Sequence, residues 1–136
     1  MQFTWPGAPT VYYGDEAGVC GYTDPDNRRT FPWGRENQAL IDYCSRLGNS
    51  RKKSQPLRRG DIRWGTCGEE VLSFVRCWKQ ESVAVAVNRG RTYAAVTVPW
   101  RHMEAVDVFT GRRHLAVDGR LSLVLEPNQG VMLENV

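Results

Sequence analysis

The stretch from Pro6 to Trp33 is the part of the sequence that most constrains the fold. Its prolines exclude a helix at the start, so residues 1–9 are expected to be extended. The β-branched and aromatic run at residues 10–13 predicts a short strand that is covered on both faces. Residues 14–34 are too rich in Gly, Pro and Asp for regular structure, and so long a loop in a compact protein is usually functional or disordered. A buried strand that leads into a long polar loop is how α/β barrels build sites at their C-terminal face.

The length of the chain limits how much of such a barrel it can contain. A complete eight-stranded α/β barrel needs about 250 residues, and this chain has 136. We therefore expect at most one β/α unit of a barrel in residues 1–55, and a second domain in residues 56–136. Met1 stands almost directly before the predicted strand, so we expect the natural N-terminus to lie outside this sequence.

A helix is predicted at residues 37–53, after the loop. Its apolar residues share one face at helical period, and Asn37 can cap its N-terminus. Three basic residues in its last turn suit the negative end of the helix dipole, and Gln55-Pro56 is expected to stop it.

The remainder of the chain is predicted to consist of short strands and turns. Asp118-Gly119 between two apolar runs is a strong hairpin signal, and regular spacing of short strands points to an antiparallel sandwich. The expected strands are 61–66, 71–78, 83–88, 92–98, 105–109, 113–117, 121–125 and 131–134.

Composition argues against several kinds of partner. The net charge is +3, no segment approaches the roughly 20 apolar residues of a membrane span, and no signal peptide precedes the first strand. Seven basic residues lie between Arg46 and Arg63, but only Trp64 lies near them, whereas single-stranded nucleic acid needs interleaved aromatic residues. We read this run as a solvated helix end, with no nucleic-acid or membrane partner.

The cysteines and histidines suggest neither a metal nor a catalytic triad. The four cysteines form no C-x-x-C pair and have no His at zinc spacing, so free thiols are expected, although Cys67 and Cys77 could face one another across a hairpin. His102 and His114 have no Ser or Cys arrangement around them. We expect no cofactor, no metal site and no catalytic residue within the chain.

Two motifs carry a resemblance to a known family. The pattern PGxPxxYYGDExG covers residues 6–18, and GxxDPxxRRxFPW covers residues 21–33. The first resembles the eighth barrel strand of the α-amylase family, glycoside hydrolase family 13, and the second resembles its neopullulanase, cyclomaltodextrinase and maltogenic amylase branch. The resemblance implies a mainly β fold, in which an antiparallel Greek-key β-sandwich (domain C) follows the last strand (10–13), substrate loop (14–34) and helix (37–53) of an incomplete (β/α)8 barrel.

The carboxylates of the loop are poor candidates for catalysis. Glycoside hydrolysis needs two carboxylates about 5–10 Å apart across the scissile bond, whereas Asp15 and Glu16 are adjacent and would point to opposite sides. The other two loop carboxylates have arginines close enough to neutralise them. The resemblance likewise assigns the catalytic carboxylates to earlier barrel strands, so this polypeptide alone should not hydrolyse glucans.

The resemblance does imply a substrate-binding role for Asp24 and Arg28, which match its Asp-Pro-x-x-Arg pattern. A carboxylate beside a guanidinium suits vicinal sugar hydroxyls, although the two side chains could instead only brace the loop through an ion pair. Gly14 should make the turn after the strand, and Glu16 should bind backbone donors.

The aromatic residues near the loop could either line a pocket or pack in a core. Tyr13 and Tyr12 are expected as pocket wall, Phe31 as core, and Trp33 as either core or a sugar-stacking ring.

Two functions are consistent with these features. In the first, the chain is the C-terminal part of an α-glucan hydrolase whose parent enzyme binds α-glucan oligosaccharides. The alternative is a non-catalytic glucan-binding or assembly module. The composition favours a cytoplasmic over a secreted parent, and barrel elements left uncovered would make the isolated chain self-associate.

Overall fold

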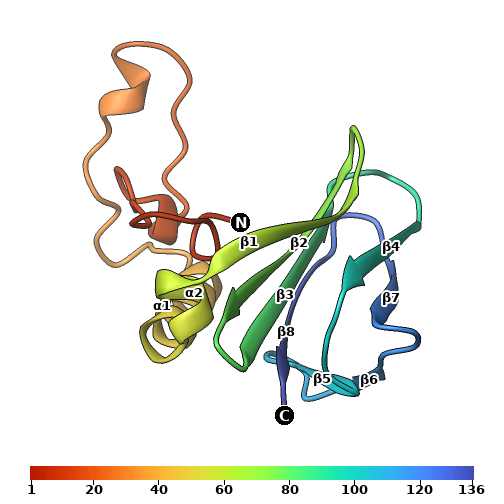
Figure 1. Cartoon of the computed structure of the whole chain (residues 1–136). Coiled ribbons are helices and arrows are strands. Elements are labelled where there is room, and N and C mark those ends of the chain that lie inside the picture. The colour runs from red at the N-terminus through yellow and green to blue at the C-terminus, as the bar shows by residue number, and fades with distance from the viewer.

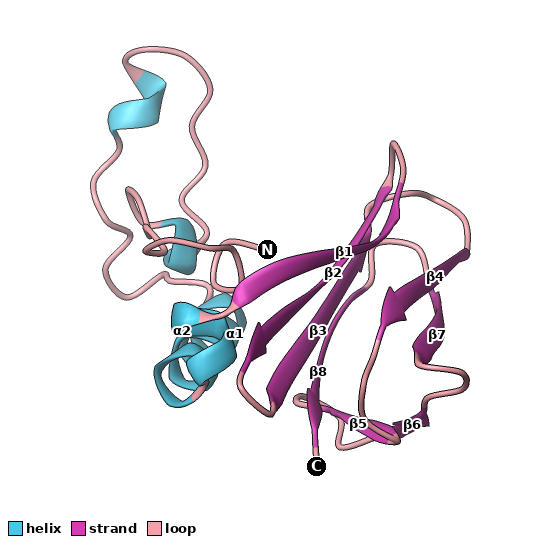
Figure 2. Ribbon diagram, viewed as in Figure 1, coloured by secondary structure: helices cyan, strands magenta, loops and turns pink.

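The computed structural model describes residues 1–136 and has two different parts (Figure 1). An N-terminal part contains a long loop and two helices, and a C-terminal part is an antiparallel β-sandwich (Figure 2). In chain order the elements are η1 Asp15–Ala17, η2 Asp26–Arg28, α1 Gln38–Lys53, α2 Gln55–Arg59, β1 Asp61–Cys67, β2 Val71–Trp78, β3 Glu81–Asn88, β4 Ala94–Pro99, β5 Glu104–Asp107, β6 Arg113–Leu115, β7 Arg120–Leu125 and β8 Gly130–Asn135. None of the helices is long and apolar enough to cross a lipid bilayer.

All eight predicted strands form, with boundaries within two residues of those expected. One sheet has six strands in the order β1-β2-β3-β8-β5-β6, and β4 pairs with β7 in a second sheet of two strands. The C-terminal strand β8 lies between β3 and β5, so the order is non-sequential, as in Greek-key sandwiches. The chain therefore has the mainly β sandwich architecture that the sequence predicts.

The larger sheet is covered on both faces. Alternate residues of β2 and β3 pack against the β4–β7 pair, where Val96, Val98 and Leu121 are each at most 1% exposed. The opposite face carries Phe74 and a second apolar cluster that reaches Leu57 of α2. Strand β3 is buried on both faces, so its alanines are as buried as its valines. This explains why its sequence is a continuous apolar run without polar alternation.

The two helices form a third layer on the outer face of this sheet. Helix α1 begins where predicted, because the Asn37 side chain accepts a 3.1 Å hydrogen bond from the Leu40 N–H. It ends at Lys53 as expected, but Gln55-Pro56 starts the short helix α2 rather than a loop. The Ser54 side chain caps α2, and proline is tolerated in the first turn of a helix because its missing N–H would be unpaired there.

Two expectations for the N-terminal region are wrong. No strand forms at residues 10–13, because a strand needs hydrogen-bonded neighbours and no other segment of the chain pairs with these residues. Residues 2–7, expected to be extended, instead form turns and bends, and Thr4 is only 2% exposed.

The pairing of residues between strands tests two predictions, the hairpin at Asp118-Gly119 and the possible pairing of Cys67 with Cys77. Asp118 and Gly119 both have positive φ (50° and 70°), and Val117 bridges to Arg120, which confirms the predicted hairpin. All four cysteines are free. Cys77 lies opposite Asp61 and Cys67 opposite Leu72, so the alternative in which the two cysteines face one another is wrong.

The sequence suggested that the basic residues at the end of α1 are all solvated, but one of them is buried. Arg51 is only 8% exposed and donates hydrogen bonds to the carbonyl oxygens of Phe3 (2.9 Å), Trp5 (3.1 Å) and Gly7. A charged side chain at the C-terminal end of a helix is normally exposed, but here the N-terminal segment folds over it and supplies the acceptors.

Candidate functional site

The predicted substrate loop, residues 14–34, stands away from the sandwich beside the helices (Figure 1). Gly14 (φ 80°) and Gly18 (φ 75°) flank η1 in the left-handed region, which favours glycine. The Asn37 N–H donates to the Ala17 carbonyl (3.1 Å) and thereby ties the start of the loop to the start of α1. The loop thus leaves and rejoins the fold at the same place.

Asp24 and Arg28 form a bidentate ion pair in the part of this loop that lies farthest from the helices. Arg28 Nε donates to Asp24 Oδ1 at 2.8 Å, and Arg28 Nη2 donates to Oδ2 at 2.7 Å. Their side chains remain 57% and 71% exposed, respectively. An exposed pair of this kind adds at most about 1 kcal/mol to stability, so both groups are open to a ligand without being needed for the fold.

A second ion pair lies beside the first. Arg29 Nε donates to Asp26 Oδ1 at 2.9 Å, and Nη2 approaches the same oxygen at 2.5 Å. Asp24 and Asp26 are therefore each paired with an arginine, as the spacing suggested.

Sequence reasoning missed the role of Gly21 in this loop. A Cβ atom at Gly21 would lie 2.5 Å from the Cα of Asn27 and 3.0 Å from the carbonyl oxygen of Asp26. The two arms of the loop therefore touch at a position where only glycine fits. The glycine that opens the second motif was the available signal, but its spacing alone does not say what it packs against.

The aromatic residues lie around the base of the loop. Phe31 and Trp33 pack with ring centroids 4.6 Å apart, and Trp33 is 80% exposed, which excludes a core position. Phe31 is only partly buried, although a core position was expected. Tyr12 and Tyr13 form an exposed pair with centroids 5.5 Å apart.

The carboxylates next to Gly14 have different environments. Asp15 accepts a 3.3 Å hydrogen bond from the Tyr12 N–H. Glu16 does not bind the backbone donors expected for it, and its buried Oε2 has no hydrogen-bond partner. Burial raises the pKa of Cys44 on α1, and the nearby charges of Glu16 and Asp15 raise it further, so both carboxylates lie on the helix side of the loop.

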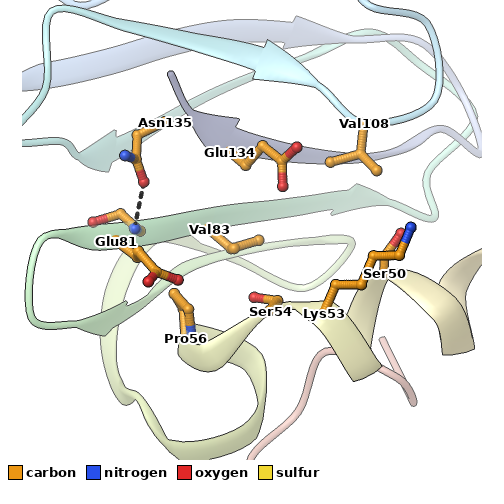
Figure 3. A pocket seen from close by; sticks show the side chains of 10 residues that line it. Ser50, Lys53, Ser54, Pro56, Glu81, Val83, Val108, Glu134 and Asn135 are labelled. Atoms are coloured by element: carbon orange, nitrogen blue, oxygen red, sulfur yellow. Dashed lines mark hydrogen bonds between the residues drawn. The ribbon is translucent and has the colours of Figure 1, made fainter.

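The surface has hollows near the loop and elsewhere. One of about 620 Å³ lies at the loop base and is lined by residues that include Cys20, Arg29 and Arg35. Another of about 380 Å³ separates the end of α1 from the sandwich, where Lys53 and Ser54 lie across from β3 and β8 (Figure 3). Neither includes Asp24 or Arg28, and no group of three or more His, Cys, Asp and Glu side chains is placed to hold a metal ion.

Comparison with known proteins identifies the region to which the chain corresponds. The family model described as maltogenic amylase, C-terminal domain, matches residues 67–131. Neopullulanase 2 of Thermoactinomyces vulgaris is 36% identical over 99% of this chain and 24% of its own length. An amylopullulanase of Thermoanaerobacterium saccharolyticum is 30% identical over 98% of this chain and 12% of its own length. The chain thus spans a quarter or less of these relatives.

Solved structures agree over nearly the whole chain. A crystal structure of an Anoxybacillus α-amylase superimposes with a TM-score of 0.87 at 30% identity, over 98% of this chain and 30% of that one. The α-amylase of Geobacillus thermoleovorans, solved as a complex with acarbose, gives 0.86 at 26% identity, over 98% and 31%. The chain belongs to the α-amylase family, glycoside hydrolase family 13, in which it corresponds to the C-terminal part of neopullulanase-, cyclomaltodextrinase- and maltogenic amylase-like members.

Proposed function

We propose that this chain supplies substrate-binding residues and the domain C sandwich of an α-glucan hydrolase. Asp24 and Arg28 are the proposed contacts to sugar hydroxyls on the non-reducing side of the cleaved bond. The observation that carries the proposal is their exposed, two-point ion pair on a loop that stands away from the sandwich.

The chemistry of the pair suits a sugar. The ion pair fixes both side chains in one plane while Arg28 Nη1 and part of the carboxylate remain open, so little conformational freedom is lost when vicinal hydroxyls bind. The related Geobacillus α-amylase was solved with the oligosaccharide analogue acarbose, which supports a sugar as the ligand class.

We further propose that the chain is inactive by itself. Two loop carboxylates are paired with arginines, and the other two are sequence neighbours near α1. None of these offers the pair of opposed carboxylates that glycoside hydrolysis requires. The isolated chain should release no reducing sugar from maltotriose or cyclodextrin, and an enzyme-like rate would overturn this part of the proposal.

A chimera tests the substrate-binding role. In neopullulanase 2 of Thermoactinomyces vulgaris, the corresponding segment would be replaced by this chain, and steady-state kinetics measured on maltotriose. Asp24→Asn and Arg28→Gln should each raise KM about tenfold, because about 1.4 kcal/mol of hydrogen bonding to a charged group is lost.

Asp26→Asn is the matched control for these variants, because it breaks the neighbouring pair in the same loop. It should leave KM within about twofold. Equal effects of Asp24→Asn and Asp26→Asn would show that both pairs only brace the loop, and would refute a specific subsite role for Asp24.

Self-association of the isolated chain remains part of the proposal. Tyr12, Tyr13 and Trp33 form exposed aromatic surface near segments that a barrel would cover. Sedimentation velocity should show oligomers whose fraction rises with concentration, whereas a strict monomer at high concentration would contradict this expectation.

A further inference from the structure

A third hollow lies on the sandwich, between the paired strands β1 and β2 and the segment that joins β4 to β5. It measures about 260 Å³ and is lined by Arg63, Val75, Cys77, Ser82, Pro99, Trp100, Arg101 and Gly119. Figure 1 shows the substrate loop and the segment after β4 on opposite sides of strands β1 to β3, so this hollow is separate from the loop. We propose that it binds a phosphate group, which the guanidinium groups of Arg63 and Arg101 hold between them.

The side chain of Arg101 is fixed in place although the residue is exposed. Its Nη2 atom donates to the carbonyl oxygens of Lys79 and Glu81, the second at 3.2 Å, and its Nε atom donates to His102 Nε2 at 3.4 Å. Its Nη1 atom donates to no acceptor within the chain. Because these bonds tie the guanidinium to the turn between β2 and β3, its orientation is set before a ligand binds, and little side-chain entropy is left to lose.

The residues that support Arg101 are themselves well packed. His102 Nε2 lies 3.0 Å from the Oγ atom of Ser82, which is 1% exposed, and the His102 ring packs edge-on against Trp100 with centroids 5.3 Å apart. The indole N–H of Trp100 donates to the Glu104 carbonyl at 3.2 Å. Burial and the charge of Arg101 lower the pKa of His102, so its ring stays neutral and accepts from Arg101. This wall of the hollow is therefore preorganised.

Arg63 approaches the hollow from the opposite wall. Its position on β1 pairs with Val75 of β2, so both side chains lie on the face of the sheet that meets the β4–β7 pair. Arg63 is exposed, and its side chain forms no hydrogen bond or ion pair within the chain. All five N–H donors of its guanidinium are therefore available to a ligand.

The side chains that line the hollow carry a net positive charge, because they include two arginines and no carboxylate. Asp61, Glu81 and Asp118 are the acidic residues near it in sequence or strand pairing. None of them forms an ion pair with Arg63 or Arg101. Glu81 and Asp118 line the two hollows on either side instead. The hollow therefore favours an anion over a cation or a neutral ligand.

A phosphate group fits these donors better than other anions do. A phosphate monoester carries a charge of about −1.5 to −2 at pH 7, which two guanidinium groups balance, whereas a carboxylate or a chloride ion carries a single charge. The planar N–H pairs of arginine also match phosphate oxygens in a bidentate geometry. The backbone N–H groups of Arg101 and Gly119 donate to no acceptor within the chain, and Gly119 has no side chain that would keep a ligand away.

The experiment is a titration of the ¹⁵N-labelled chain with inorganic phosphate at neutral pH and constant ionic strength. The indole N–H signal of Trp100 and the backbone N–H signals of Arg101 and Gly119 should shift with a saturable dependence on phosphate concentration. Arg63→Gln and Arg101→Gln should each weaken binding about tenfold, because hydrogen bonds between charged groups are lost. Asp61→Asn should strengthen binding about twofold, because it removes a nearby negative charge.

Two further ligands separate the sources of such a phosphate group. Glycerol 3-phosphate should bind at least as tightly as inorganic phosphate if the natural ligand is a phosphate monoester, whereas weaker binding would identify free phosphate as the ligand. Either order supports the site. Glycerol without phosphate should cause no shift at the same concentration, and equal shifts with glycerol would contradict recognition of the phosphate group.

Arg91→Gln is the matched control for the arginine variants. It removes an exposed arginine that lies outside the hollow, so it should leave the affinity unchanged. If Arg101→Gln lowers thermal stability by freeing the turn between β2 and β3, the Arg63→Gln result decides, because Arg63 forms no bonds that support the fold.

Two outcomes overturn the inference. The absence of saturable shifts at millimolar phosphate would exclude the site. Equal losses in Arg63→Gln and Arg91→Gln would mean that phosphate is attracted only by the net charge of the chain, which is +3. Neither outcome bears on the proposed subsite role, because no residue of the substrate loop lines this hollow.

Discussion

Residues 1–7 and the loop at 14–34 are close in sequence but are stabilised by different interactions: buried hydrogen bonds in the first, and exposed ion pairs in the second. The first segment is clamped by two buried arginines: Arg51 binds three of its carbonyl oxygens, and Arg76 of β2 (2% exposed) binds that of Thr4 at 2.9 Å. The loop is held mainly by its own exposed ion pairs and by the close contact at Gly21. Backbone acceptors buried with charged donors give rigidity, and exposed charges that pair with each other stay accessible.

Neither arginine of the clamp forms an ion pair with a carboxylate. Arg76 also donates to the Gly60 carbonyl from Nε (3.2 Å) and Nη2 (2.7 Å), so its charge is spread over backbone dipoles. Burial lowers the pKa of Arg76 and the neighbouring charge of Arg51 lowers it further, while the nearby Asp61 carboxylate opposes both effects. The segment that precedes the loop is therefore fixed to both helix and sandwich, while the ion pairs of the loop beyond it stay exposed.

The largest expected effect is that of Arg76→Met. Removing the guanidinium leaves the buried carbonyls of Thr4 and Gly60 without donors, at an expected loss of about 2–4 kcal/mol in the free energy of unfolding. Urea denaturation of the chain measures the loss, and amide exchange should show faster exchange at residues 3–5. The exposed Arg63→Met on β1 is the control and should change stability by less than about 0.5 kcal/mol. An equal loss in both variants would contradict the clamp.

The difference between these regions also explains what the sequence could predict. Strand and helix periodicity, the Asn37 cap and the Asp118-Gly119 turn are local signals, and they gave the sandwich and α1 correctly. The clamp depends on contacts between residues more than 40 positions apart, and basic residues at a helix end give no sign of burial. The spacing in the loop predicted that arginines would lie close to Asp24 and Asp26, but not the contact at Gly21, because spacing does not show which arms of a loop meet.

The next effect in size should be that of Gly21→Ala, and it should appear in function rather than in stability. The added Cβ would collide with the backbone of Asn27, so the loop must open and displace the pair of Asp24 and Arg28. In the chimera described above, KM should rise about tenfold while kcat changes less, because substrate positioning is lost. The isolated chain should lose under about 1 kcal/mol of stability. Gly68→Ala, where a Cβ meets nothing within 4 Å, is the matched control and should leave KM unchanged.

A smaller effect is expected from acidification, which acts on the sandwich. Burial lowers the pKa of His102, and the nearby Arg101 lowers it further; burial and Arg112 likewise lower the pKa of His114. Both folded pKa values lie below the unfolded value of about 6.5, so the stability that the neutral rings contribute is present above that pH and is lost as pH falls through the folded values. Thermal unfolding between about pH 7 and 5 should show Tm falling, and His102→Gln with His114→Gln should flatten that dependence. An unchanged slope in the double variant would contradict the assignment.

The smallest effect on stability should come from the residues that the proposed function depends on most. Asp24→Asn weakens an ion pair whose partners are more than half exposed, so water already screens most of the attraction. The free energy of unfolding should change by less than about 1 kcal/mol, as for Asp26→Asn. Urea denaturation of the two variants beside Arg76→Met tests the contrast between the regions directly. A large loss in Asp24→Asn would mean that the pair supports the fold, and would remove the reason to regard it as free for substrate. A near-zero change together with a raised KM in the chimera would separate binding from folding at this pair.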